Sequence, residues 1–240
     1  MRPAGSRTGS LALPALRPRT APGGTVRVTP PRLRLVLLDF DGVLARYDQR
    51  VRLASLARAA ACTPAHVSEV LLDSGLDRAY DSGALDTAKY LQHLSAGLGT
   101  AVDAATWIEA RVAATQADPA VLALVALLAS RVEVGVLTNN GPLLLEALPR
   151  IVAPLFPMLD GRVLCSGILG VRKPDRAIFE RALAHFDVHA QETLFVDDLF
   201  VNVQGARAAG LHADTVVHAR SLRTVLRRYG LMRAGPVTPD

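Results

Sequence analysis

The sequence predicts an α/β fold in which a parallel sheet is interrupted by a helical insert. Four apolar runs have the length of strands and are continuous, which is typical of strands buried on both faces of a parallel sheet. Segments with helical periodicity follow the later runs. About 75 residues between the first two runs carry no strand pattern, which indicates a large insertion after the first strand.

The expected strands cover residues 35–38, 132–137, 193–196 and 215–217. Each run stops abruptly at polar residues: the first at Asp39, the second at Thr138, the third at Asp197 and the last at His218. In an open parallel sheet, ligands bind at the carboxyl ends of the strands. We therefore expect the functional site at this edge.

Helical patterns are expected at 119–130, 175–186 and 202–209 in the sheet region and at 86–95 and 103–114 in the insert. Asp118 is the expected N-cap of the first, because its carboxylate can accept unpaired N–H groups, and Gly210 stops the third. Within the insert, Thr63 followed by Pro64 predicts a helix start, and Gly75 predicts its end.

The ends of the chain are basic, whereas the middle is acidic. Residues 1–34 contain seven arginines and no acidic residue, so the net charge of +5 belongs to the ends. We expect 1–34 to be a disordered basic tail, because it has too few apolar residues to offset its ordering entropy. Residues 219–240 are expected to form a basic helix or tail. Without aromatic residues among the N-terminal arginines to stack on bases, a nucleic-acid partner is not expected.

Cysteine usage and hydropathy predict a soluble cytoplasmic protein. Cys62 and Cys165 are far apart and belong to no metal-binding motif, which fits a reducing compartment. No apolar run approaches the roughly 18 residues of a membrane-spanning helix, so no membrane partner is expected. The sequence says nothing of oligomeric state.

Carboxylates gather where the strands end. Asp39 and Asp41 follow the first strand, and Asp197 and Asp198 follow the third. Four carboxylates at one sheet edge repel one another unless a cation neutralises them, and hard oxygen ligands select Mg²⁺. With Lys173 and helix N-termini nearby, such an edge suits a phosphate bridging to the metal, with a spare carboxylate as nucleophile.

Four motifs in register give a specific resemblance. Residues 37–44 (LLDFDGVL) match the opening motif of the haloacid dehalogenase-like hydrolase superfamily, and Thr138-Asn139 match the second motif. The third is matched by 172–175 (RKPD) and the fourth by 195–198 (FVDD) with Asn202, Ala206 and Gly210. The chain resembles this superfamily in motif order and spacing over 35–218. The insert lies where type-1 capped phosphatases carry their cap.

The resemblance implies a Rossmann-like doubly wound parallel sheet as core, formed by residues 35–45 and 119–218, with an all-helical cap at 46–118. Residues 80–86 are similar to a glycine-containing turn in the caps of small sugar-phosphate phosphatases. Arg46 and Tyr47, where the cap begins, are candidates to reach substrate. Asp175 is expected to cap a helix, and Trp107 to pack in the core of the cap.

The resemblance also implies roles for the polar residues. Asp39 would attack phosphorus, and Asp41 would serve as acid and then base. Thr138, the backbone amide of Asn139 and Lys173 would hold the phosphate.

For the metal, the resemblance implies Mg²⁺ bound by Asp39, the main-chain carbonyl of Asp41 and Asp198. Asp197 would support these ligands from behind rather than bind the ion. Asn202, where many relatives carry a further Asp, has a less defined supporting role.

The function so predicted is Mg²⁺-dependent hydrolysis of small phosphate monoesters, such as sugar phosphates, through an aspartyl phosphate, with a small phosphorylated metabolite as partner. A 2-haloacid dehalogenase needs neither a second carboxylate like Asp41 nor Mg²⁺. A phosphomutase would share all the motifs and differ only in its cap. A catalytically idle binding protein would not need every reactive residue type, and no GxSxG motif points to a serine hydrolase.

Overall fold

A five-stranded parallel sheet forms the centre of the protein in the computed structural model, which describes residues 32–232. The strands lie in the order β5 (Val163–Cys165), β4 (Glu133–Thr138), β1 (Leu35–Leu38), β6 (Thr193–Asp197) and β7 (His212–Thr215). All neighbouring pairs are parallel. The chain builds outward on one side of β1 and then on the other. This is the doubly wound α/β fold expected from the sequence.

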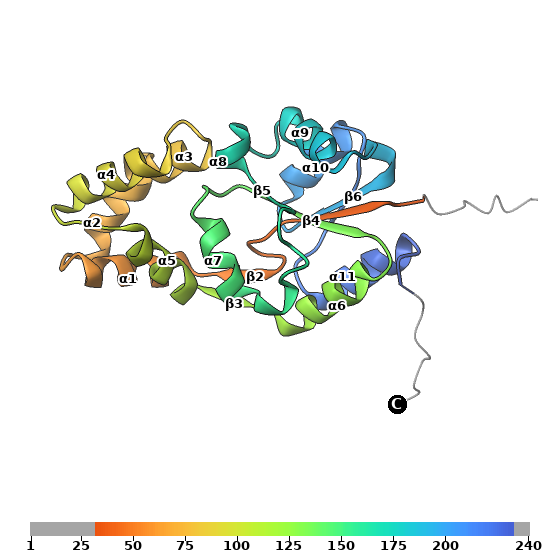
Figure 1. Cartoon of the computed structure of the whole chain (residues 1–240), viewed down its shortest axis with the longest axis horizontal. Helices are drawn as coiled ribbons and strands as arrows, with labels where there is room; N and C mark the ends of the chain where they lie inside the picture. Colours follow the sequence, from red (N-terminus) through yellow and green to blue (C-terminus); the bar gives the residue numbers. More distant parts are fainter. Residues whose placement is uncertain (1–31, 233–240) are drawn as a thin grey trace, which may run out of the picture.

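Helices cover both faces of the sheet (Figure 1). One face packs against α6 (Pro119–Ala129), α7 (Leu144–Ile151) and α11 (Ala219–Arg228), and the other against α9 (Arg176–Phe186) and α10 (Phe200–Ala208). Strand β1 serves both cores, because its side chains alternate: Val36 and Leu38 join the first core, Leu35 and Leu37 the second. All four are fully buried, which explains the continuous apolar run.

The two edge strands differ from expectation. β7 covers His212–Thr215 rather than 215–217, and β5 carried no clear signal. An edge strand has one unpaired side and tolerates polar residues, so β7 reads His-Ala-Asp-Thr instead of an apolar run. Three residues of β5 are too few to stand out. The apolar runs in the sequence therefore predicted the central strands but not the bounds of the two edge strands.

The insert after β1 forms a helical cap at one end of the molecule (Figure 1). Five α-helices build it, with a π-helical turn at Glu69–Asp73: α1 (Gln49–Ala59), α2 (Pro64–Ser68), α3 (Leu76–Asp81), α4 (Thr87–Leu98) and α5 (Ala104–Ala113). The insert is not wholly helical, because β2 (Ala45–Tyr47) and β3 (Thr115–Ala117) pair antiparallel at its two ends. This ribbon joins cap to core.

Helix starts follow the capping residues read from the sequence. Thr63 accepts a hydrogen bond from the backbone N–H of His66, and Pro64 stands at the first turn of α2. Asp118 accepts from Ala120 N at 2.9 Å, and Asp175 accepts from Ala177 N at 2.9 Å. Short 3₁₀ turns occur at Ala153–Leu155 and Ala190–Glu192, and α8 is one turn at Ser166–Leu169.

The end of α3 and the turn that follows it fix the cap to the core. The Tyr80 hydroxyl accepts a hydrogen bond from Leu143 N at 3.0 Å, and the Ser166 hydroxyl donates to the carbonyl of Asp81. A Cβ at Gly83 would lie 2.7 Å from the Gly167 carbonyl oxygen. Only glycine allows this close approach. Trp107 is buried in the separate core of the cap, as expected.

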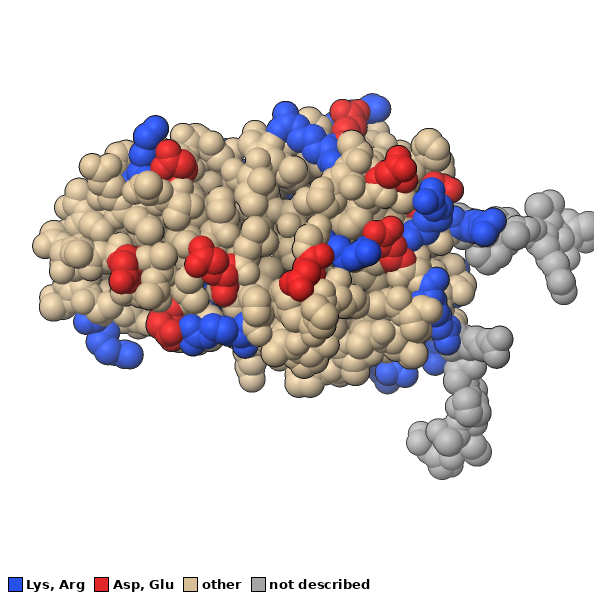
Figure 2. Space-filling view, in the orientation of Figure 1, with Lys and Arg blue, Asp and Glu red and all other residues tan. Residues whose placement is uncertain are grey.

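The chain ends lie partly outside the described residues. The expected disordered tail falls on residues 1–31, which are outside, as are 233–240. Helix α11 packs Leu222, Val225 and Leu226 into the main core. Figure 2 shows acidic and basic side chains interspersed on the face in view. Among the described residues, no helix combines the length and apolarity that crossing a membrane would require.

Candidate active site

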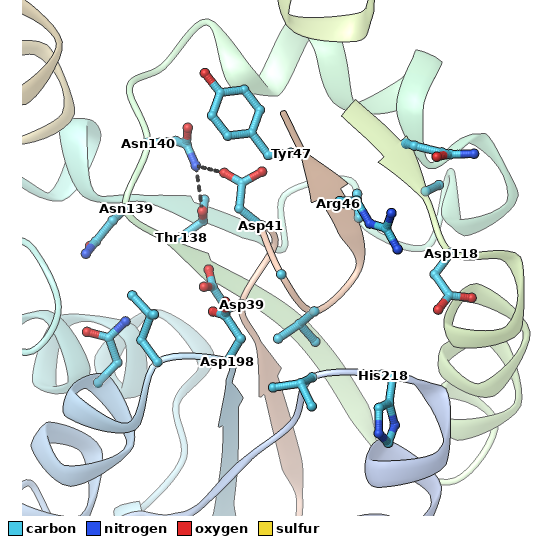
Figure 3. Close-up of a pocket in the computed structure, with 18 of the residues that line it drawn as sticks. Asp39, Asp41, Arg46, Tyr47, Asp118, Thr138, Asn139, Asn140, Asp198 and His218 are labelled. Carbon is cyan, nitrogen blue, oxygen red and sulfur yellow. Dashed lines mark hydrogen bonds between the residues drawn. The ribbon is translucent and has the colours of Figure 1, made fainter. Parts of the chain in front are cut away.

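The polar residues at the carboxyl ends of β1, β4 and β6 surround one cavity of about 790 Å³ (Figure 3). The cavity opens between the core and the ribbon that leads to the cap. Its lining includes most of the residues expected from the sequence: Asp39, Asp41, Thr138, Asn139, Lys173, Asp198 and Asn202. The fold therefore brings together residues up to 163 positions apart in the chain, from Asp39 to Asn202.

Asp39 lies at the floor of the site, directly after β1, and is 6% exposed. Its Oδ1 accepts hydrogen bonds from Phe40 N at 2.7 Å and lies 2.8 Å from Lys173 Nζ. No described residue donates a hydrogen bond to the other oxygen, Oδ2, which is therefore open to a ligand. Burial raises the pKa of Asp39 to about 7; the Lys173 charge opposes this shift and the Asp197 charge adds to it.

Lys173 is the buried cation of the site. Its Nζ lies between Asp39 and Asp197, at 2.8 and 2.7 Å, and donates to the Leu137 carbonyl at 2.9 Å. Burial lowers the pKa of Lys173, but the charges of Asp39 and Asp197 raise it further, and the net direction is upward. The lysine therefore stays charged although it is 5% exposed.

Asp197 is fully buried and holds other site groups in place. Its Oδ1 accepts from Leu199 N at 2.8 Å, and its Oδ2 accepts from Lys173. Asn202 donates its side-chain amide to both oxygens at 3.0 Å. With both oxygens engaged, Asp197 positions Lys173 and the start of α10. The sequence-based expectation of supporting roles for Asp197 and Asn202 fits these contacts.

Asp41 faces the cap and is held by two donors. Arg111 of α5 places Nη2 2.6 Å from Oδ1 and 2.7 Å from Oδ2 of Asp41. Asn140 donates its amide to Oδ2 of Asp41 at 3.0 Å and to the Thr138 hydroxyl at 2.8 Å (Figure 3). Because Thr138 accepts from Asn140, its own hydroxyl proton is free for a ligand oxygen.

Asn139 does not direct its side chain at the expected phosphate. Its Oδ1 accepts from Lys173 N at 2.9 Å, and its Nδ2 donates to the Lys173 carbonyl at 3.0 Å. The side chain thus fixes the loop that carries Lys173. The expected role of the Asn139 backbone amide is separate from this contact and stays a prediction.

Three carboxylates could hold a metal ion: Asp39, Asp197 and Asp198 each offer an oxygen within 4.8 Å of the others. Asp198 accepts no hydrogen bond from another described side chain. Burial, followed by the Asp197 charge, raises the pKa of Asp198. The backbone beside it is shaped for this carboxylate, since a Cβ at Gly42 would lie 2.3 Å from Asp198 Oδ2. An all-oxygen set of this kind fits Mg²⁺, with Asp39 and Asp198 as the open ligands.

Sequence reasoning missed Arg111, which is 3% exposed and meets Asp41 from the cap. A signal was present: Trp107, Ala110 and Arg111 share the buried face of α5 at helical spacing, so a charged residue stands on a buried face. Asn140 was also missed, although it directly follows the second motif. Arg46 and Tyr47 line the cavity, as expected, and the Arg111 guanidinium lies 4.2 Å from the Tyr47 ring centroid.

Comparison with known protein families assigns the chain to one of them. Residues 33–210 match the model described as haloacid dehalogenase-like hydrolase. The match covers most of the chain, so the protein belongs to this hydrolase family. The resemblance seen in the four motifs is thereby confirmed.

Two curated relatives are named as phosphatases. A sesquiterpene phosphatase, AstK of Aspergillus oryzae, is 43% identical over 56 residues, which are 23% of this chain and 28% of that protein. A phosphatase of Mycobacterium tuberculosis is 37% identical over 84 residues, 35% of this chain and 38% of that protein. The matched regions thus span less than two fifths of either relative.

Solved structures share the fold. A haloacid dehalogenase family enzyme from Bacteroides thetaiotaomicron, in complex with magnesium and inorganic phosphate, aligns with a TM-score of 0.64 at 18% identity, covering 76% of this chain and 93% of that one. A 2-haloacid dehalogenase from Pseudomonas syringae aligns with a TM-score of 0.57 at 21% identity, covering 82% and 99%. These likenesses show the fold alone.

Proposed function

We propose that the protein is a Mg²⁺-dependent phosphatase that cleaves small phosphate monoesters through an aspartyl phosphate on Asp39. The observation that carries this proposal is the placing of two carboxylates with different surroundings in one cavity. Asp39 is buried beside Lys173, whereas Asp41 is more exposed and held by Arg111 and Asn140. Two such carboxylates suit two different roles.

In the first half of the reaction, a carboxylate oxygen of Asp39 attacks phosphorus. The bond from phosphorus to the ester oxygen breaks, and Asp41 gives its proton to the departing alcohol. The Thr138 hydroxyl and the Asn139 backbone N–H donate to the phosphoryl oxygens, and Lys173 offsets their charge. The Thr138 proton is available because Asn140 already fills the acceptor side of that hydroxyl.

In the second half, water attacks phosphorus of the aspartyl phosphate. Asp41, now a carboxylate, takes the water proton, and the bond between phosphorus and Asp39 breaks to release inorganic phosphate. Asp41 can serve both halves because the hydrogen bonds from Arg111 and Asn140 hold it facing the cavity.

Mg²⁺ would be held by Asp39, Asp198 and the main-chain carbonyl of Asp41. When bound, it would neutralise the carboxylates and polarise the phosphoryl oxygens. Support comes from the three-carboxylate cluster and from the gap that Gly42 leaves for Asp198. The magnesium and phosphate bound by the Bacteroides enzyme agree with this proposal.

The cap limits the substrate to small molecules, since it is docked on the core through Tyr80 and Gly83 beside the site. We also propose that the cap is a type-1 cap. A cytoplasmic location is proposed as well, in keeping with the two free cysteines. A dehalogenase remains the rival with a similar fold. It would not need Asp41, which here has three hydrogen bonds holding it in the cavity.

The test is a panel of phosphate monoesters assayed for phosphate release with Mg²⁺ and again with excess EDTA. We expect turnover that depends on Mg²⁺ and is lost on chelation. Undiminished turnover in EDTA, or halide release from 2-haloacids without phosphate release from any ester, would reject the proposal.

A further inference from the structure

A second cavity, of about 330 Å³, lies between the cap and the core beside the proposed active site. It shares part of its lining with the first cavity, so the two are continuous around Asp41. The shared residues are Asp41, Tyr47, Asn139, Asn140 and Arg172. Tyr47 and Asn140 flank Asp41 in Figure 3. Because Asp41 would protonate the leaving oxygen, the alcohol part of a bound ester would extend toward this cavity.

Arginines dominate the charged lining of the second cavity. Arg52 and Arg111 reach it from cap helices and are 7% and 3% exposed. Arg172 reaches it from the core loop that precedes α9, and Arg78 stands at its exposed rim. In three of these arginines, Arg52, Arg111 and Arg172, the Nε atom is buried and has no hydrogen-bond partner among the described residues. Buried donors without partners are rare and point to a missing acceptor.

The carboxylates of the cavity do not satisfy all these cations. Asp77 binds Arg52, with contacts of 2.6 and 3.1 Å, and Asp41 binds Arg111. Asp81 is the remaining acid. Burial, followed by the Asp77 charge, raises the pKa of Asp81 to about 7, and the charges of Arg172 and Arg52 oppose this shift.

Arg78 and Arg172 have no described carboxylate in contact, and of these two only Arg172 is partly buried. Its side chain makes no hydrogen bond or salt bridge with any described residue, although it is half-buried and immediately precedes Lys173. Desolvating a guanidinium without an acceptor is costly, so an acidic ligand group would be favoured there.

We propose that the second cavity is an anion subsite, in which Arg172 binds a carboxylate or a second phosphate carried by the alcohol part of the substrate. Arg111, whose Nε is also buried without a partner, completes the donors around this group. The inference rests on the proposed phosphatase function, because it names the class of ester that the same site prefers: one with a second anionic group a few bonds from the ester oxygen.

The subsite can be tested by binding alone, without turnover. Trp107 is the single tryptophan and lines the second cavity, with the Arg52 guanidinium 5.3 Å from its ring centroid. In EDTA, malonate and methylenediphosphonate are titrated into the full-length protein while tryptophan emission is recorded.

We expect a saturable change in emission, with an affinity that falls about 10–100-fold in Arg172→Gln, as for the loss of a charged hydrogen bond, and less in Arg172→Lys. Arg176→Gln, an exposed arginine paired with Glu180, is the matched control and should bind like wild type. Tighter binding of malonate assigns the subsite to a carboxylate, and tighter binding of the diphosphonate to a second phosphate.

Turnover adds a second readout. We expect 2-phosphoglycolate or ethylene glycol bisphosphate to exceed ethyl phosphate in kcat/KM, and Arg172→Gln to remove that preference while ethyl phosphate changes less than about twofold. Equal losses of kcat/KM on all esters in Arg172→Gln, or malonate binding that this variant leaves unaffected, would overturn the subsite. Phosphate release without anion preference would leave the phosphatase standing and the subsite rejected. Arg172-dependent binding without any phosphate release would support the subsite and reject the phosphatase function.

Discussion

Arg111 of the cap and Asp41 of the core form a salt bridge across the mouth of the site, with one nitrogen of the arginine 2.6 and 2.7 Å from the two carboxylate oxygens. Arg111 is nearly fully buried, so water does not compete strongly for the pair. Because Arg111 comes from α5, the position of the cap and the position of the proposed acid–base residue are linked.

Arg111→Met is expected to lower kcat on alkyl phosphates by about 10–100-fold, because Asp41 loses the donor that orients it. Aryl phosphates, whose leaving group needs little protonation, should lose less, and Arg111→Lys should lose less than Arg111→Met. Arg150→Gln is the control, since Arg150 of α7 makes an exposed salt bridge to Glu109 of α5, the helix that carries Arg111. Equal losses in the Arg150 and Arg111 variants would contradict a specific role for Arg111.

Gly42 tests the metal site without removing a ligand. Gly42→Ala should raise the Mg²⁺ concentration for half-maximal activity at least about tenfold, because its Cβ would displace the Asp198 carboxylate. Gly42 also has a φ of +85°, so the substitution adds backbone strain. Gly75→Ala controls for strain: it has a φ of +77° but no atom within 4 Å of the new Cβ. An unchanged Mg²⁺ requirement in Gly42→Ala would remove Asp198 from the metal site.

Lys173→Met should destabilise the fold by about 3–5 kcal/mol in EDTA, because Asp39 and Asp197 then lose the buried cation between them. The loss should be greater at pH 8 than at pH 5. The pKa of Asp39 is raised above its unfolded value to about 7, so the stability linked to its proton is present at low pH and lost as pH rises toward 7 and beyond. At pH 8 Asp39 is therefore charged, and without Lys173 its charge has no buried cation beside it. Urea unfolding at both pH values measures this. A loss independent of pH would show that Asp39 does not titrate with the pair.

Asp81→Asn should stabilise the protein at pH 8 and have little effect at pH 4. The folded pKa of Asp81 is raised from 3.8 to about 7, so its ionisation opposes folding over the range from about pH 4 to 7 and above. The gain at pH 8 is up to about 4 kcal/mol, which thermal unfolding would report as a higher Tm. Asp73→Asn, an exposed aspartate of the cap, should leave Tm unchanged. A lower Tm for Asp81→Asn at pH 8 would show that the charged form is needed.

The central parts of the fold and site were predictable from sequence because they obey local rules. The strands β1, β4 and β6 are buried on both faces and read as apolar runs, and each ends at polar residues of the site, such as Asp39, Thr138 and Asp197. Capping residues such as Thr63 and Asp118 marked helix starts.

The rest depends on contacts between distant segments. Nothing local to Arg111 says that it meets Asp41, 70 positions away, or that Arg172 and Trp107 share a cavity. Likewise, the side chain of Asn139 holds the backbone of Lys173, 34 positions later. The edge strands β5 and β7 were missed because they are short or partly polar.

The central claim, that Asp39 is the nucleophile and Asp41 the acid and base, is tested most directly by rapid mixing of Asp41→Asn with an aryl phosphate and Mg²⁺. The variant keeps the nucleophile, and the aryl leaving group needs little protonation, so phosphorylation of Asp39 should still occur. Hydrolysis of the aspartyl phosphate should be slow, because water has lost its base, a loss typically of about 10²–10⁴-fold. The account predicts a burst of phenol close to one equivalent per protein, followed by slow turnover, and no activity in Asp39→Asn. Absence of a burst in Asp41→Asn, together with substantial activity in Asp39→Asn, would contradict it.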